Sequence, residues 1–583
     1  MKAAELLAMY ERVADAPAAV GKLRLLVLDL AIRGKLVSQN ETDEPAEALL
    51  NQIATEKAAL PRRSRGKAAT VETARFDIPF ALPPGWRWSC LHEAGVLSPR
   101  NEAADDCLAA FVPMALVSAD YGTENEHAVK PWKDIKSGYS HFAEGDVGLA
   151  KITPCFENRK STIFRNLTGG FGSGTTELHV LRPILVDPSY ILIFLKSPFF
   201  IDGGVPRMTG TAGQKRIPVV YFAKSPFPLP PLAEQHRIVA KVDELMALCD
   251  QLEAARKDRE AARDRLAAAS LARINAPDPD TFQADARFAL NVLPAISARP
   301  DQVKQLRQTI LNLAVRGKLA AQESGESLDS FPAELLETLG EELPSTWGWV
   351  KLEHLLAEET RNGYSRKPDD APDGVPILRI SAGTVRRDGI VAEEAHKLIS
   401  GIDEVTRRQY GIDAGDLLAC RFNGNKAFVG RLTLFTDYLK VRPIYPDKLI
   451  RVRVNKRLAL PAYVRLAADS DLVRAEVERL CATTVGNWGI SASNLKAVRI
   501  PLPPLAEQRR VVNRVNALMS LCEQLETSLS NGEAARNSLL DALLNDALRS
   551  AGGDEVPSPD AFEAIPAKAI RKSPLHTRPS RSC

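Results

Sequence analysis

Several features that would place this 583-residue chain in other classes of protein are missing from it. No stretch approaches the ~20 uninterrupted apolar residues of a membrane helix. Residues 1–24 also lack an apolar signal core followed by a small-residue cleavage site. Eight cysteines are scattered, without the close pairs of a zinc site or of a small disulfide framework. We therefore expect a cytoplasmic protein whose cysteines are reduced thiols.

A strong charge of either sign is missing too. The chain has 76 basic and 73 acidic side chains and a formal net charge of +3. This balance does not by itself indicate nucleic-acid binding, so any surface that binds DNA has to be local. The apolar fraction of 45% is ordinary for soluble globular proteins, and the length indicates about three or four domains.

Catalytic motifs are absent as well. An adenine methyltransferase is expected to carry Asn/Asp-Pro-Pro-aromatic, whereas both Pro-Pro pairs here follow leucine, and no Gly-x4-Gly-Lys-Ser/Thr phosphate loop is present. The glycine-rich run 169–174 lacks the Lys-Ser/Thr ending, so we interpret it as a flexible turn. The eight histidines show no ligand spacing. We expect no catalytic residue, no metal and no cofactor bound by this chain.

The strongest feature that is present is an internal duplication. Leu-Pro-Pro-Leu-Ala-Glu-Gln at 229–235 recurs at 502–508, and matched residues follow each copy in the same register. Four further pairs match in the same order: 30–36 with 313–319, 86–88 with 347–349, 145–146 with 415–416, and Gly213 with Gly486. Each half therefore has one order of parts: a helix, Trp-x-Trp, a divergent globular region, the Pro-Pro motif and a long helix.

The segments after the two Pro-Pro motifs have the periodicity of long helices. Apolar residues step by 4, 3, 4 and 3 in both copies, at Ile238, Val242, Leu245, Cys249 and Leu252 and at Val511, Val515, Leu518, Cys522 and Leu525. This is the spacing of a coiled-coil seam, so these helices are predicted to pair. The first seam weakens near Arg259, where we expect a local change of register.

The divergent regions 76–219 and 342–500 differ from the helices. Short apolar runs bounded by Gly, Pro and Asp indicate strands at 147–153, 176–181, 376–380 and 449–454. Both regions are therefore predicted to be mixed α/β domains.

The duplicated Leu-Pro-Pro-Leu-Ala-Glu-Gln motif, each copy following a variable region and starting a long helix, resembles the specificity subunits of type I restriction-modification systems. The resemblance runs to about residue 548 and includes 145–154 and 415–420. It implies two target-recognition domains, each reading one half of a bipartite site in double-stranded DNA. It also implies paired helices that dock two methyltransferase (modification) subunits, together with endonuclease/translocase (restriction) subunits. S-adenosylmethionine, ATP and magnesium are then expected on those partners.

These observations together predict an α+β multidomain chain. Two mixed α/β target-recognition domains form a pseudo-two-fold tandem repeat, separated by two long antiparallel coiled-coil helices. The expected divisions are 1–75 (helical segment and linker), 76–219 (first recognition domain), 220–341 (first helical spacer and linker), 342–500 (second recognition domain), 501–548 (second helical spacer) and 549–583 (disordered tail).

Candidate DNA contacts are the polar and basic residues of the two divergent regions. Arg and Lys can hold phosphates or guanine edges, and Asn and Gln can pair with adenine, although exposed basic loops are more often only solvated surface. In the first region the candidates are Lys151, Asn158, Arg159, Lys160, Gln214, Lys215 and Arg216. In the second they are Arg361, Asn362, Arg366, Lys367, Arg421, Asn423, Asn425, Lys426 and Asn487.

The Pro-Pro motifs supply a second set of candidates: Pro231, Glu234, Gln235, Pro504, Glu507 and Gln508. Proline suits a helix start, and glutamate favours the positive end of the helix dipole. These residues form a helix cap, or they fix the angle between recognition domain and helix, or they dock a partner subunit. The Trp-x-Trp tryptophans are expected to anchor a core rather than to contact bases.

Two other functions are compatible with parts of the sequence. A single-chain restriction or methylation enzyme would read its own site, but it should carry the missing catalytic motifs. A coiled-coil scaffold without a DNA role would predict similar surfaces in both halves, whereas the halves diverge in their globular regions.

Overall fold

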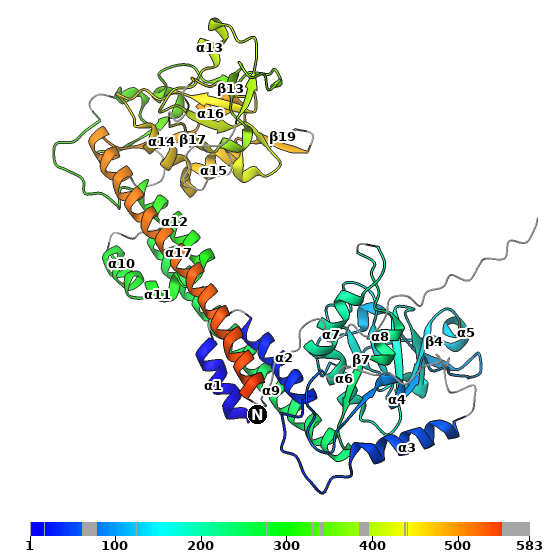
Figure 1. Ribbon diagram of the computed structural model, residues 1–583. Coiled ribbons are helices and arrows are strands. Elements are labelled where there is room, and N and C mark those ends of the chain that lie inside the picture. The colour runs from blue at the N-terminus through cyan, green and yellow to red at the C-terminus, as the bar shows by residue number, and fades with distance from the viewer. Residues whose placement is uncertain are drawn as a thin grey trace, which may run out of the picture. The chain divides into compact units, whose positions relative to one another are not determined.

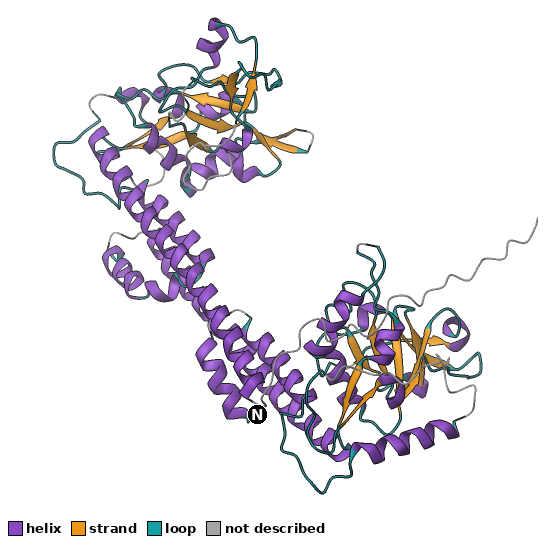
Figure 2. Ribbon diagram, in the orientation of Figure 1, coloured by secondary structure: helices purple, strands orange, loops and turns teal. Residues whose placement is uncertain are grey.

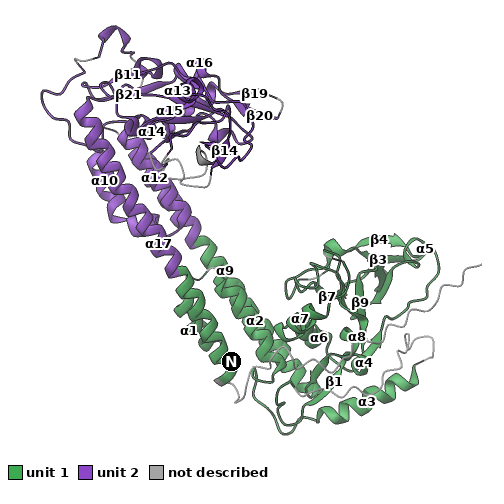
Figure 3. Ribbon diagram, turned by 45° about the horizontal axis from the view of Figure 1, so that its top comes forward, with its two compact units in different colours: residues 1–258, 533–583 green, residues 259–532 purple. Residues whose placement is uncertain are grey.

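The computed structural model describes residues 2–550 apart from 15, 17, 61–78, 124, 212, 276–277, 279, 329–330, 338–342, 384–395, 437–438, 440 and 485. The expected linker around 61–75 and nearly all of the tail, 551–583, lie outside these residues. The chain forms two compact units (Figure 3): unit 1 contains residues 1–258 and 533–583, and unit 2 contains residues 259–532. Each is built from helices and strands (Figures 1 and 2).

The globular part of unit 1 has two four-stranded sheets. One has the strand order β2-β9-β6-β7 and is antiparallel, and the other has the order β4-β3-β8-β5, in which β3 and β8 are parallel. The strands are β2 (Gly95–Leu97), β3 (Leu108–Val112), β4 (Ala128–Pro131), β5 (Ser140–Ala143), β6 (Val147–Ala150), β7 (Ser161–Ile163), β8 (Phe171–Gly174) and β9 (Leu178–Pro183). Helix α6 (Pro188–Lys196) packs against strands β6 and β7, and both α6 and α7 (Pro198–Gly204) contact helix α2 (Ala19–Ile32). The shorter helices are α3 (Ala46–Ala59), α4 (Leu91–Ala94), α5 (Trp132–Ile135) and α8 (Val219–Lys224).

The globular part of unit 2 repeats the first of these sheets and has smaller sheets beside it. Its main sheet has the order β12-β18-β15-β17, and β16-β20-β19 and β13-β14 form smaller sheets. The strands are β12 (Arg361–Asn362), β13 (Val375–Ile377), β14 (Lys397–Ile399), β15 (Leu417–Cys420), β16 (Phe422–Asn423), β17 (Leu432–Leu434), β18 (Leu449–Val452), β19 (Ala482–Thr484) and β20 (Asn487–Gly489). The helices are α13 (Glu404–Tyr410), α14 (Pro461–Ala468), α15 (Asp471–Arg479) and α16 (Ala492–Lys496). The expected strands at 147–153, 176–181, 376–380 and 449–454 correspond to β6, β9, β13 and β18.

The helices of unit 1 form a bundle in which two neighbours run in opposite directions. It contains α1 (Ala3–Val13), α2 (Ala19–Ile32), the first part of α9 (Leu232–Asn275) and the last part of α17 (Leu505–Ser550). Arg24 of α2 pairs with Asp250 at 2.5 Å, and Gln39 beyond its end bonds Glu234, so α2 and α9 are antiparallel. Lys22 pairs with Asp541, and Lys35 donates to the Leu548 carbonyl, so α2 and α17 are parallel. Within unit 1, α9 and α17 are therefore antiparallel.

Unit 2 builds the same kind of bundle from α10 (Phe282–Asn291), α11 (Leu293–Ile296), α12 (Pro300–Ala314), the last part of α9 and the first part of α17. Arg299 pairs with Glu260 at 2.9 Å and Asn312 bonds Asn275 at 3.1 Å, so α12 runs parallel to α9. Arg307 pairs with Glu526 at 3.3 Å, whereas Arg510 pairs with Glu326, beyond the end of α12. Each bundle is thus completed by the end of the long helix that begins in the other repeat.

The predicted seams are buried at most of their positions, and Leu252, Leu518 and Leu525 are half-buried. Ile238, Val242, Leu245 and Cys249 are fully buried, as are Val511 and Val515, with Cys522 nearly so. Beyond Arg259 the buried stripe of α9 resumes at Ala267, Leu271 and Ile274. These positions are one residue later than the heptad would place them, as a change of register requires.

The first residues of each long helix join it to the globular part of its own unit. Trp86 donates its indole N–H to the buried Glu234 carboxylate at 2.9 Å, and Trp347 bonds Glu507 at the same distance. The tryptophans lie beside short antiparallel pairs, β1 (Arg87–Cys90) with β10 (Pro226–Leu229) and β11 (Gly348–Lys351) with β21 (Arg499–Leu502). Both indoles are buried, as core anchors should be.

The glutamines of the Pro-Pro motifs are fully buried. The Gln235 side-chain oxygen accepts from the Asp187 amide at 2.9 Å, and its nitrogen donates to the Pro230 carbonyl at 3.0 Å. Gln508 makes equivalent bonds, to the Leu460 amide at 2.7 Å and the Pro503 carbonyl at 2.9 Å. Asp187 and Leu460 are the residues before α6 and α14. One amide side chain therefore fixes the start of a long helix against the start of a recognition-domain helix.

The expectation for the glycine-rich run is wrong in part. Residues 168–170 form a short turn, but Phe171–Gly174 is strand β8 of a four-stranded sheet. A Cβ added at Gly172 would lie 2.1 Å from the Ala110 carbonyl oxygen. These glycines therefore allow a close backbone approach between neighbouring strands, not a flexible turn.

Gln508→Ala should destabilise unit 2 by about 2–4 kcal/mol, because the Leu460 amide and the Pro503 carbonyl would be left buried without partners. Gln524→Ala, on an exposed position of the same helix, is the matched control and should change stability by less than about 0.5 kcal/mol. Urea unfolding of the two variants measures the difference. Equal stabilities would show that the glutamine does not hold this joint.

Candidate nucleic-acid interface

Each unit presents one loop and one hairpin side by side. In unit 1 they are residues 151–160, after β6, and residues 209–211 with 213–216, which we call the unit 1 loop and the unit 1 hairpin. Arg216 bridges to Thr209 and to Ile152, so the hairpin is closed and lies against the loop. In unit 2, β16 pairs with β20, which pairs with β19. Residues 421–430 therefore form the unit 2 loop, and residues 482–484 with 486–489 form the unit 2 hairpin, in the same arrangement. Gly213 and Gly486 turn the two hairpins with φ of 78° and 80°.

The unit 1 hairpin carries three of the sequence candidates, Gln214, Lys215 and Arg216, and all three are exposed. Arg216 makes a two-point contact with Glu177, from Nη2 to Oε1 at 2.8 Å and from Nε to Oε2 at 2.9 Å. These hydrogen bonds lower the pKa of the Glu177 carboxyl, so the carboxylate stays charged. Lys151 is next to this pair, because its amide bonds the Glu177 carbonyl at 2.9 Å.

The other unit 1 candidates lie at the far end of the loop. Asn158 is exposed. Lys160 directs its ammonium to the Met114 carbonyl at 3.4 Å, and Arg159 has φ of 59° and its guanidinium 3.9 Å from Asp202. The side chains of Arg159 and Lys160 therefore take part in contacts within the unit.

The unit 2 loop and hairpin gather cations around two aromatic rings. The guanidinium of Arg421 lies 4.7 Å from the centre of the Phe422 ring, and the ammonium of Lys448 lies 5.5 Å from the same ring. Lys426 lies over Trp488 of the hairpin at 4.8 Å. No ion pair joins these three cations to a carboxylate among the described residues. Their charge is therefore available to an external anion, and the rings hold it in place.

The asparagines of unit 2 differ in what their oxygens do. Asn423 Oδ1 accepts from the Asn425 amide at 2.8 Å, and Asn425 Oδ1 accepts from the Ala427 amide at 3.0 Å. Both oxygens therefore hold the turn of the loop. Asn487 is exposed on the hairpin, at the position equivalent to Gln214. Because an asparagine reads adenine with both oxygen and nitrogen, Asn487 is the better candidate of the three.

The remaining candidates are on other parts of unit 2. Arg361 and Asn362 form β12, which pairs with β18 at the edge of the main sheet, two strands from Cys420. Arg366 donates to the Ser400 carbonyl at 3.1 Å and to Asp369 at 2.9 Å, beside the β13–β14 hairpin, and Lys367 follows it in the chain. The structure thus brings Arg421, Asn423, Asn425, Lys426 and Asn487 together and leaves Arg366 and Lys367 elsewhere.

Four residues of these surfaces were missed from the sequence: Glu177, Phe422, Lys448 and Trp488. Glu177 and Lys448 directly precede β9 and β18, the strands that pair with β6 and β15, so they occupy equivalent positions with opposite charge. An acid and two aromatic rings carry neither the positive charge nor the amide group by which the DNA contacts are predicted from the sequence. The repeat register could have identified Trp488 as the equivalent of Lys215.

A buried or half-buried cation donates hydrogen bonds to backbone carbonyls of each loop. Lys196, at the end of α6, donates to the carbonyls of Ala119 at 2.9 Å and Arg159 at 3.0 Å, and it is 2% exposed. Burial lowers the pKa of Lys196 to about 7. In unit 2, Arg474 of α15 donates to the Val429 carbonyl at 2.6 Å and the Lys426 carbonyl at 3.2 Å.

Lys196→Met tests this contact through pH. Between pH 7 and about 10.5 the unfolded chain binds a proton that folded Lys196 has largely lost, so the stability of the wild type rises with pH in this window. The variant lacks that gain. The stability gap between wild type and variant should therefore widen by up to about 1.4 kcal/mol per pH unit.

Urea unfolding at pH 7, 8 and 9 measures this gap. Arg474→Met should give a stability gap that does not change with pH, because arginine stays protonated. Lys133→Met, at an exposed lysine of unit 1, the unit that contains Lys196, should give almost no gap. A constant gap for Lys196→Met would contradict a lowered lysine pKa.

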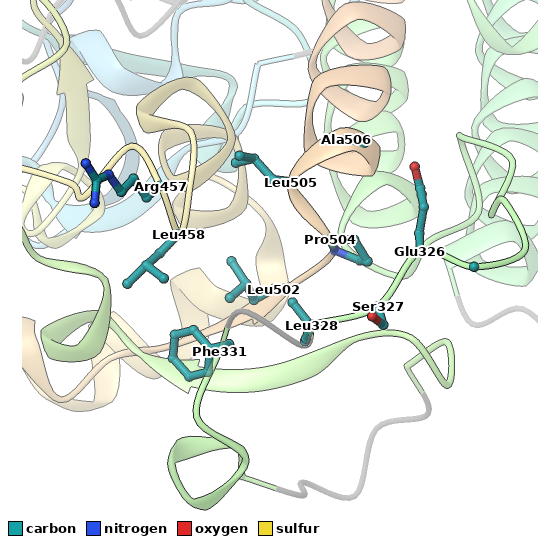
Figure 4. A pocket seen from close by; sticks show the side chains of 11 residues that line it. Glu326, Ser327, Leu328, Phe331, Arg457, Leu458, Leu502, Pro504, Leu505 and Ala506 are labelled. Carbon is teal, nitrogen blue, oxygen red and sulfur yellow. The ribbon is translucent and has the colours of Figure 1, made fainter.

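A pocket of about 340 Å³ lies beside the start of α17 (Figure 4). Leu328, Phe331, Leu458 and Leu502 group on one side of it, and Glu326 lies on the other side near Pro504. Glu326 is paired with Arg510. The pocket lies at the joint between the long helix and the recognition domain, because residues of both line it.

The part of the chain that the structure describes contains no group of three or more His, Cys, Asp or Glu residues that could hold a metal ion, and its seven cysteines are free. None of the helices in these residues is both long enough and apolar enough to cross a membrane.

Comparison with known proteins identifies the family. Over 563 residues the chain is 33% identical to the Escherichia coli type I restriction enzyme EcoEI specificity subunit, covering 91% of this chain and 94% of the relative. This chain is a type I specificity subunit. The EcoAI specificity subunit of Escherichia coli is 32% identical, with the same shares covered. No protein-family model matches the chain.

A solved structure agrees with the fold of this specificity subunit. A chain from work on the complex assembly and conformational transition of the type I restriction-modification system aligns with a TM-score of 0.51 and 20% identity. The alignment covers 81% of this specificity subunit and all of that chain. The α+β repeat with two long helices is therefore the fold of a solved type I protein as well.

Proposed function

We propose that this specificity subunit reads a bipartite sequence in double-stranded DNA, one half-site through each loop and hairpin. The observation that carries the proposal is the equivalent placement of the two surfaces, on one scaffold, with different side chains at matched positions. Two similar but non-identical readers recognise two different half-sites, so the target is asymmetric with an unread spacer. Phosphate contacts supply affinity and base-edge contacts supply discrimination.

The chemistry of the system belongs to the partners in this proposal. Two methyltransferase subunits dock on the helical part and bring S-adenosylmethionine, and endonuclease/translocase subunits bring ATP and magnesium. The specificity subunit itself is non-catalytic and acts in the cytoplasm. The Pro-Pro motif residues Glu234, Gln235, Glu507 and Gln508 are buried within this chain, which favours a structural role over direct docking.

Exchange of one recognition domain tests the proposal. Replacing residues 76–219 with the matching region of a relative should change one half-site of the methylated sequence and leave the other unchanged, because each unit carries its own loop and hairpin. Genome-wide mapping of methylated adenines gives both half-sites in one experiment, in cells that carry this gene with its partner genes. Cells without this gene are the control. Alteration of both half-sites by a folded hybrid would contradict independent readers.

The unpaired cations of unit 2 predict a salt effect. Affinity falls as salt rises, and we call the magnitude of the slope of log affinity against log salt the salt slope. Arg421→Gln, Lys426→Gln and Lys448→Gln should each reduce the salt slope by about 0.9, the value for one lost phosphate contact. Arg408→Gln is the matched control, because Arg408 is exposed and paired with Glu404 on α13. Fluorescence anisotropy of labelled target DNA with the methyltransferase complex, from 50 to 200 mM salt, measures the slopes. Unchanged slopes in all three variants would show that this surface does not contact DNA.

A further inference from the structure

The contact between Arg216 and Glu177 differs from the other candidate DNA contacts in its geometry. The guanidinium has five N–H donors. Two of them, on Nε and Nη2, face the Glu177 carboxylate, and one on Nη1 donates to the Gln214 carbonyl at 3.1 Å. The contact therefore leaves one N–H on each terminal nitrogen. The Arg216 side chain is 44% exposed, so these donors are accessible from solvent.

The position of Arg216 is fixed by the backbone as well as by the carboxylate. Its amide and carbonyl both pair with Thr209, and the preceding Lys215 carbonyl accepts from the Thr153 amide at 2.9 Å and from its hydroxyl at 3.0 Å. Glu177 lies directly before β9 in the sheet. A guanidinium held by a strand pair and a two-point carboxylate contact has lost most of its rotamer freedom before any ligand arrives.

We infer that Arg216, oriented by Glu177, reads a guanine in the half-site that unit 1 contacts. This inference rests on the proposed function. Guanine presents two acceptors, O6 and N7, in the major groove, and two parallel arginine donors match them. Arg216 is the specificity-determining residue and Glu177 is a positioning residue.

The carboxylate argues for a base contact over a phosphate contact. The Glu177 carboxylate is charged and lies within 3 Å of Nε and Nη2 of the guanidinium, so a phosphate bound at the same place would meet a like charge. A phosphate contact also needs only a point charge, which the neighbouring Lys215 and Lys151 provide without a fixed direction. A base edge, in contrast, is neutral and requires donors that point in one direction.

Unit 2 lacks this pair at the equivalent positions. In the repeat register, Gly489 is equivalent to Arg216, Lys448 is equivalent to Glu177, and Trp488 is equivalent to Lys215. The guanine contact is therefore expected in one half-site only. Unit 2 reads its half-site with Asn487 and the cations around its two rings.

The experiment compares the methylated motifs of four complexes with the wild type: Arg216→Lys, Arg216→Gln, Glu177→Gln and, as matched control, Arg87→Gln. Arg87 is an exposed arginine of unit 1 that pairs with Glu47, so the control removes a similar ion pair. Methylation rates are measured on target duplexes with guanine or another base at each position of the half-sites. Affinity is measured over the same salt range.

The inference expects Arg216→Gln to lower discrimination at a single guanine of one half-site by roughly ten-fold or more. Arg216→Lys should restore little of it, because lysine cannot donate two parallel bonds. Glu177→Gln should lower discrimination at the same guanine without lowering the salt slope, since Arg216 keeps its charge. The other half-site and the Arg87→Gln complex should match the wild type.

Three results would overturn the inference: full guanine selectivity in Arg216→Gln, a half-site for unit 1 without guanine, or an equal loss on all sequences with a lower salt slope. The last result identifies a phosphate contact. These results leave the proposed function standing, provided that the wild-type complex methylates a bipartite motif. A wild-type complex with no such motif would overturn the proposed function and the inference together.

Discussion

The buried contact between a tryptophan indole and the first turn of a long helix determines how each half of this specificity subunit is built. Trp86 with Glu234 and Trp347 with Glu507 place an N–H against a carboxylate in the core, where burial raises the pKa of both carboxyls above the usual range. A carboxyl in such a place is stabilised only while its partner is present. The glutamine that follows each glutamate then fixes the recognition-domain helix at the same point. The direction of the helix and the position of the loop and hairpin are thus linked through two adjacent side chains.

The same scaffold supports two different surfaces because the contacts of the joint lie away from the loops. Tyr190 and Tyr463 repeat one bond, from the phenol to a carbonyl of the strand before the Pro-Pro motif, at 2.8 and 2.7 Å. Lys196 and Arg474, in contrast, hold their loops with different groups on neighbouring helices. The contacts that both repeats share set where a loop begins, and the contacts that differ between the repeats set the path of the loop. A pair of half-site readers can therefore diverge in chemistry without changing the joint.

Periodicity and repetition predicted much of the fold from sequence. The seams at Val242 and Val515, the strands β6 and β18 and the anchoring role of the tryptophans follow from local patterns that burial imposes on helices, strands and large aromatic rings. Partners distant in sequence did not follow. Glu177 lies 39 residues from Arg216, and no spacing rule joins an acid before one strand to a hairpin beyond two helices. Strand β8 was missed because its glycines serve close backbone packing, which has no period.

Unit 1 is discontinuous, and this has a consequence for the order in which the chain folds during synthesis. Leu540 and Leu548 complete the core of the bundle that begins with α1 and α2, whereas unit 2 needs no residue beyond 532. At roughly 5–20 residues per second, the last part of α17 follows Asp258 by about 15–60 seconds. The second unit therefore completes its core first, and the apolar face of α2 and α9 stays open on the ribosome until the final helix emerges. Unit 1 is therefore the first unit to begin along the chain and the last to be completed.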